Sequence, residues 1–147
     1  MSLIADVMTP APVTIGPYET VQRAAQLMDE LNVGALPVYH GSRLMGIVTD
    51  RDITVRATAA GLDPRTAEVD LVMSTRVRCC HVGQTVAEVL ALMSSVQIRR
   101  VPVLDDRHAL VGIVSLGDLA EREPEGVEEA MRCISTPAEP DRSAQLV

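Results

Sequence analysis

The chain contains the stretch GIVTDRD at residues 46–52 and a second version of it, GIVSLGD, at residues 112–118. Both versions begin with apolar residues typical of a strand, reach a hydroxyl side chain, and place a carboxylate three residues further on. A hydroxyl followed by an acidic residue at this spacing is typical of the start of a helix. Each stretch therefore predicts a strand that runs directly into a helix, and the two occurrences indicate a unit written twice.

The repetition extends outward from this motif on both sides. The pairs that recur in the same order are Val7-Met8 with Val72-Met73, Thr20-Val21 with Thr85-Val86, and Pro37-Val38 with Pro102-Val103. Two copies of this length indicate a duplicated small domain with pseudo-two-fold symmetry rather than a repeat array. We expect the first repeat over residues 1–62, the second over residues 63–136, and a disordered tail over residues 137–147.

Each copy has the pattern of a β-α-β-β-α unit, which places the chain in the α/β (α+β) class. Apolar residues at helical spacing follow Thr20 and Thr85, which stand where helix N-caps belong. Each copy then continues as two short strands and a second helix. The expected segments are strands at 36–39, 44–48, 101–104 and 110–114, second helices at 50–61 and 116–123, and a last short helix at 127–134.

Composition excludes several classes of function. The 147 residues carry a net charge of −7, which argues against nucleic acid as a partner because phosphate contacts dominate that affinity. All 13 basic residues are Arg, so the lysine of a phosphate-binding loop is absent from the sequence. No apolar run approaches the length of a membrane span, and three cysteines without CxxC spacing fit a reducing compartment. We therefore expect a cytoplasmic protein.

The repeated strand-to-helix junction has two compatible interpretations. A hydroxyl beside the free N–H groups of a helix start favours an anion, and a nearby carboxylate can accept hydrogen bonds from ribose hydroxyls, so the junction suits a ribose phosphate. The same residue types also form a capping box, which needs no ligand.

The doubled pattern resembles the CBS domain family, and in particular a tandem CBS pair. The resemblance rests on the repeated Val-Met and Pro-Val segments and on residues 46–52 and 112–118, and it covers roughly residues 4 to 120. It implies two packed domains with two clefts, an adenosine-type nucleotide as regulatory ligand, and association as a homodimer of pairs. It also implies regulation of another protein rather than catalysis.

The resemblance assigns roles to individual residues. Asp52 and Asp118 correspond to ribose-binding carboxylates, and Thr49 and Ser115 to hydroxyls beside the phosphate. The remaining implied ligand-binding residues are Thr14 and Cys79 near the base, Arg99 and Arg100 at the phosphate, Arg51 at a phosphate or paired with a neighbour, and Leu36, Pro37, Ile47, Val101, Pro102 and Ile113 along the strands.

The two copies differ at positions that matter for a ligand. Cys79 stands where the first copy has Thr14, and Arg99-Arg100 stand where it has Gly34-Ala35. We therefore predict unequal clefts, with one nucleotide bound well and a second weakly or not at all. The alternative for the two arginines is a solvated helix end, where cations complement the helix dipole.

The expected function is a non-catalytic sensor of AMP, ADP, ATP, S-adenosylmethionine or NAD that signals to an unidentified protein. A dimerisation scaffold without a ligand is the alternative. An enzyme is disfavoured because the sequence has no Ser-His-Asp order, HExxH or GxSxG motif. A metal or redox role for Cys79, Cys80 and His81 is disfavoured because neighbours on an extended segment point to opposite faces. No metal and no required cofactor are expected.

Overall fold

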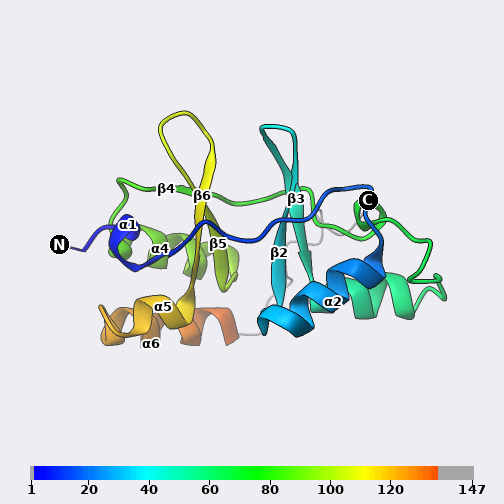
Figure 1. Cartoon of the computed structure of the whole chain (residues 1–147). Coiled ribbons are helices and arrows are strands. Elements are labelled where there is room, and N and C mark those ends of the chain that lie inside the picture. The colour runs from blue at the N-terminus through cyan, green and yellow to red at the C-terminus, as the bar shows by residue number, and fades with distance from the viewer. Residues whose placement is uncertain (1, 136–147) are drawn as a thin grey trace. The chain divides into compact units, whose positions relative to one another are not determined.

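The computed structural model describes residues 2–135 and has the expected mixture of helices and strands (Figure 1). Among these residues the chain forms two compact units. One unit comprises residues 13–77, and the other combines residues 2–12 with residues 78–135. Within the described part of the chain, no helix is long and apolar enough to cross a membrane.

The unit of residues 13–77 is built from one long helix, a β-hairpin and a second, irregular helix. Helix α2 (Val21–Leu31) begins where Thr20 accepts a hydrogen bond from the amide of Arg23 at 3.1 Å. Strands β2 (Ala35–His40) and β3 (Arg43–Thr49) pair antiparallel and lead into α3 (Asp50–Asp52), the π-helix η1 (Ile53–Thr58) and the later 3-10 turn η2 (Val69–Leu71). The core of this unit consists of Ile15, Val21, Ala24, Met28, Leu36, Val38, Val48, Ala57, Ala67, Val69, Val72 and Met73.

The other unit repeats this plan and adds a helix. Its elements are α1 (Ile4–Val7), β1 (Thr9–Pro10), β4 (Cys80–His81), α4 (Val86–Val96), β5 (Arg100–Leu104), β6 (Leu110–Ser115), α5 (Leu116–Ala120) and α6 (Pro124–Ser135). The strands form one sheet in the order β1-β6-β5-β4, with α6 packed against α4 and α5. Its core includes Ile4, Val86, Met93, Val103 and Leu119.

The approach segment at the start of each sequence repeat, residues 4–10 or 69–74, packs on the hairpin of the other repeat. Strand β1, from the start of the chain, pairs with β6, and Ser74, near the start of the second repeat, pairs with Ile47 of β3. The glycines of the repeated motif permit these approaches. A Cβ on Gly46 would lie 2.5 Å from the carbonyl oxygen of Ser74, and one on Gly112 would collide with Met8. The boundaries between the two compact units therefore lie near residues 12 and 77, whereas the boundary between the two sequence repeats lies near residue 62.

The helices that follow the junctions differ most from the sequence expectation. The first is α-helical for one turn and then π-helical over Ile53–Thr58, and its counterpart α5 ends at Ala120 rather than 123. The last helix starts at Pro124, three residues before the predicted position, because proline fits the first turn of a helix, where the N–H has no intrahelical partner. The tail expected at 137–147 lies outside the described residues.

Candidate functional site

The junction in the unit of residues 2–12 and 78–135 is a complete capping box. Ser115 ends β6, and its Oγ accepts a hydrogen bond from the amide of Asp118 at 3.2 Å. In return, Oδ2 of Asp118 accepts from the amide of Ser115 at 2.8 Å. The other carboxylate oxygen of Asp118 makes no hydrogen bond to any described residue, and the side chain is half-buried. The cap therefore fixes this carboxylate while leaving one of its oxygens available.

A hollow of about 330 Å³ lies beside this junction. That volume is at the lower end of the range of small-molecule sites. The residues that line it are Arg99, Arg100, Ser115, Leu116, Gly117, Ala120, Val127 and Met131. Three of the sequence-predicted residues, Arg99, Arg100 and Ser115, are thus brought together at one concave surface.

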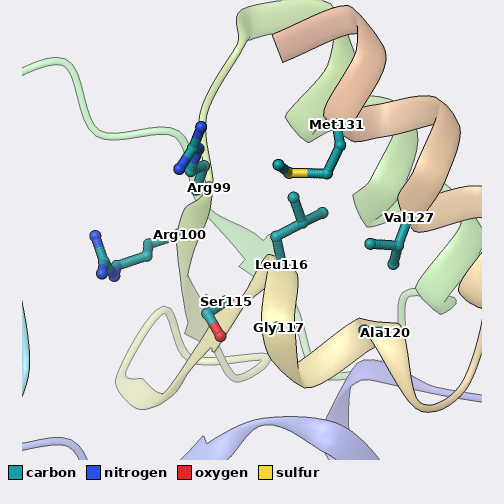
Figure 2. A pocket seen from close by; sticks show the side chains of 8 residues that line it. All are labelled: Arg99, Arg100, Ser115, Leu116, Gly117, Ala120, Val127 and Met131. Atoms are coloured by element: carbon teal, nitrogen blue, oxygen red, sulfur yellow. The ribbon is translucent and has the colours of Figure 1, made fainter. Parts of the chain in front are cut away.

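The hollow is polar on one side and apolar on the other. Figure 2 shows Arg99 and Arg100 on the β5 side, and Leu116, Val127 and Met131 on the side formed by α5 and α6. Both arginines are exposed, and arginine always carries its charge in proteins. Such a surface suits a ligand with an anionic group at one end and an apolar or aromatic group at the other.

The equivalent junction in the unit of residues 13–77 holds a more deeply buried carboxyl. Thr49 and Asp52 form the same capping box, with both hydrogen bonds at 3.0 Å, but Asp52 is only 7% exposed. Burial raises the pKa of the Asp52 carboxyl above its ordinary value, while the hydrogen bonds from Thr49 and the charge of Arg56 act in the opposite direction. The hydrogen-bond partners of this carboxylate lie within its own unit.

Arg56 explains why the two junctions differ. Its Nε lies 3.9 Å from Oδ1 of Asp52, and its Nη1 donates to the carbonyl oxygens of Val72 and Met73 at 3.1 Å each. The π-helical turn that follows α3 carries Arg56 to this position. In the other unit α5 ends before Arg122, which is exposed, and Asp118 forms no ion pair with any described residue.

The remaining predicted residues lie at several kinds of position. Thr14 and Arg51 are exposed. Leu36 and Val101 belong to the two cores, so a ligand could reach them through the backbone rather than through their side chains. The strand partners Pro37 with Ile47 and Pro102 with Ile113 are paired across the two hairpins, where both prolines are buried and both isoleucines are half-buried.

Burial favours the thiol form of Cys79 and Cys80. Burial raises the pKa of the half-buried Cys79, and burial together with Cys79 raises that of Cys80 to about 12. The Cys80 thiol donates to the carbonyl oxygen of Pro102 at 3.7 Å. Over residues 2–135, no group of three or more His, Cys, Asp or Glu side chains has an arrangement that could hold a metal ion.

Sequence reasoning missed the apolar side of the hollow. Val127 and Met131 are one helical turn apart, so the sequence does carry a signal that they share a face of α6. What that face covers depends on how α6 packs against α4 and α5, which local spacing does not encode.

The sequence model of the CBS domain family matches residues 4–57 and 67–125. The chain therefore belongs to the CBS domain family, with two CBS repeats. CBS pairs are regulatory modules.

Several relatives are similar over most of their length. The CBS domain-containing protein YhcV of Bacillus subtilis is 46% identical over 120 residues, which are 82% of this chain and 84% of YhcV. Hypoxic response protein 1 of Mycobacterium tuberculosis is 37% identical over 139 residues, which are 93% of this chain and 96% of that protein. By contrast, the inosine-5'-monophosphate dehydrogenase of Methanocaldococcus jannaschii is 32% identical over 111 residues, 75% of this chain but 21% of the enzyme.

Solved structures show the same fold. The crystal structure of Hypoxic Response Protein I with two coordinated zinc ions matches with a TM-score of 0.73 and 39% identity, covering 82% of this chain and 98% of that one. The CBS domain pair of protein MJ0100, in complex with 5'-methylthioadenosine and S-adenosyl-L-methionine, matches with a TM-score of 0.74 and 29% identity, covering 82% and 94%. Some CBS pairs of this fold thus bind adenosine compounds.

Proposed function

We propose that this protein is a non-catalytic regulatory module that binds an adenosine-type nucleotide at the β6–α5 junction and signals to a separate protein. The observation that carries the proposal is the hollow where Arg99 and Arg100 adjoin the Ser115 junction. The complex of the MJ0100 pair with two adenosine compounds supports the choice of ligand class.

The chemistry of the hollow suggests how such a ligand would bind. The two guanidinium groups would attract the phosphate, and arginine suits this role because its planar fork can make two parallel hydrogen bonds to phosphate oxygens. The hydroxyl of Ser115 accepts from the amide of Asp118 and can still donate its own proton. Asp118, with one oxygen available, would accept from the ribose hydroxyls.

We propose that one nucleotide binds per chain with useful affinity. The first copy lacks the two arginines, since Gly34 and Ala35 stand at the equivalent positions. Its carboxylate, Asp52, is buried and already paired with Arg56. A second nucleotide at that junction would have to displace this pair.

Transmission of the signal belongs to the proposal as well. We infer that the protein is a homodimer of CBS pairs and that an unidentified partner protein responds to the liganded form. The ligand-free scaffold is the competing function, and the two complete capping boxes are the observation in its favour, because a cap requires no ligand.

A thermal-shift and calorimetric titration with AMP, ADP, ATP, S-adenosylmethionine and NAD distinguishes the two. A ligand that binds the native state raises the unfolding midpoint by mass action, so the module predicts a shift with at least one of these compounds and the scaffold predicts none. We expect R100Q and D118N to weaken the binding of the active compound at least tenfold. R107Q removes an exposed arginine of the same unit that does not line the hollow, and it should leave affinity unchanged.

A further inference from the structure

Two imidazoles pack edge to face at the end of the β5–β6 hairpin that is far from the hollow. His81 ends β4, and His108 lies in the turn that joins β5 to β6. Their ring centroids are 5.6 Å apart, with the ring planes inclined at 72°. Both side chains are exposed, and the hairpin pairs Arg100 with Ser115 at its other end. The two histidines are therefore separate from the candidate nucleotide site.

We propose that His81 and His108 form a binding site for a divalent transition-metal ion that prefers imidazole ligands, such as Zn²⁺ or Ni²⁺. Neutral imidazole is the commonest protein ligand of these ions. A tetrahedral zinc ion with metal–nitrogen bonds of about 2.0–2.1 Å would hold two imidazole centroids about 5 Å apart. The observed separation of 5.6 Å is close to this value, so small side-chain rotations would bring both rings onto one ion.

The backbone under both histidines is fixed by hydrogen bonds, which favours a preformed site. His81 donates its amide to Oε1 of Gln84 at 2.8 Å, and its carbonyl accepts from the amide of Gln84 at 3.0 Å. In the turn that carries His108, Oδ1 of Asp105 accepts hydrogen bonds from the amides of Arg107 and Ala109 at 2.8 and 2.9 Å. Ordering the ligands before the metal arrives lowers the entropic cost of binding.

His108 also occupies a backbone conformation that its turn imposes. Its φ is 61°, in the left-handed region, and its amide donates to the carbonyl oxygen of Asp105 at 3.0 Å. Asp105 lies in the same turn as His108, so its carboxylate adds negative potential close to a bound cation. With two protein ligands, water molecules would complete the coordination of the metal.

The first copy provides a natural contrast. Gly16 stands where the second copy has His81, and the histidine of the first hairpin turn, His40, instead contacts Tyr18 with ring centroids 5.6 Å apart. A phenol ring is a poor substitute for imidazole as a zinc ligand. The proposal therefore predicts a single site per chain, and it makes His40 a matched control.

The test is a calorimetric titration of the metal-free full-length protein with ZnCl₂. We expect one ion per chain, with affinity at least tenfold weaker in both H81Q and H108N and unchanged in H40Q and R100Q. Asparagine is chosen at position 108 because it tolerates a left-handed backbone, and H81Q alters an exposed side chain, so circular dichroism should match the wild type.

Titration with Co²⁺ identifies the ligand type, since thiolates give a strong near-ultraviolet charge-transfer band that imidazoles do not. No such band is expected, and C133S, which removes the exposed thiol, should bind the metal as wild type does. Absence of zinc binding, full affinity in both histidine variants, or loss of binding in C133S would overturn the proposal. The proposed nucleotide site can fail without affecting this result, because no residue is shared between the two sites.

Discussion

Replacement of Gly46 by alanine tests how the approach segment of the second repeat, which ends at Ser74, is attached to the hairpin of the first. The amide of Ile47 donates to the carbonyl oxygen of Ser74 at 3.0 Å. In return, the amide of Ser74 donates to the carbonyl oxygen of Ile47 at 2.8 Å. The Cβ added in G46A would lie 2.5 Å from the Ser74 oxygen, about 1 Å closer than the ordinary contact of 3.4 Å. The Ser74 oxygen belongs to the backbone, so this clash can be relieved only if Ser74 and its neighbours move away from β3.

The cost follows from the bonds that such a separation weakens. Two hydrogen bonds, each with a net contribution of about 0.5–1.5 kcal/mol, give a loss of about 1–3 kcal/mol in the free energy of unfolding. At this chain length that loss corresponds to a fall in Tm of about 2–12 °C. In G112A the closest atom is Sδ of the flexible Met8 side chain, and the nearest backbone atom, the carbonyl oxygen of Thr9, is 3.0 Å away, so we expect a smaller loss than in G46A.

Thermal and urea unfolding, monitored by circular dichroism, measure both effects. G83A is the matched control because a Cβ at Gly83 meets no atom within 4 Å, and its stability should equal or slightly exceed that of the wild type. If G46A unfolded at the same midpoint as G83A, the pairing of Ser74 with Ile47 could not be as described.

Two further predictions concern titratable groups. Because the pKa of Asp52 is raised in the folded state, its contribution to stability is greatest below the unfolded-state value and is lost as the pH rises through the folded-state value. D52N resembles the protonated form, so its free energy of unfolding relative to wild type should increase from pH 3 to pH 7, and a difference independent of pH would contradict this. Burial raises the pKa of Cys79 and Cys80, whereas Cys133 is exposed, so a disulfide thiol reagent at pH 8 should modify one thiol per chain rapidly. C133S should abolish that fast phase, and a fast phase that survives would show that a buried thiol is accessible.

The sequence predicted those parts of the fold that local patterns determine. Helices α2 and α4 start directly after Thr20 and Thr85, as predicted, because the cap and the helical spacing of apolar residues are both local signals. The packing of each approach segment could not be predicted in this way. Residues 4–8 and 69–73 carry similar apolar patterns, so neither pattern specifies which hairpin its segment will join.

The same limit applies to the candidate site. Sequence alone indicated Arg99, Arg100 and Ser115, because charge and motif position are visible in a single chain, and the structure brings these three together. The apolar side formed by Val127 and Met131 was not predicted, since it depends on the packing of α6. The π-helical turn after α3 likewise could not be predicted from a local sequence pattern. This turn brings Arg56 close to Asp52.

The capping boxes show why the repeated motif does not by itself establish a ligand site. Both copies make the same two hydrogen bonds between the hydroxyl residue and the acidic residue, so the motif is equally well explained as a helix start in each. What differs is the surroundings. In one copy an arginine lies beside a buried carboxylate, whereas in the other the helix ends early, the carboxylate keeps an available oxygen, and Ser115 of the junction lines a hollow together with two exposed arginines. The motif thus forms the helix start in both copies, and differences outside the motif produce the surface on which the proposed nucleotide site rests.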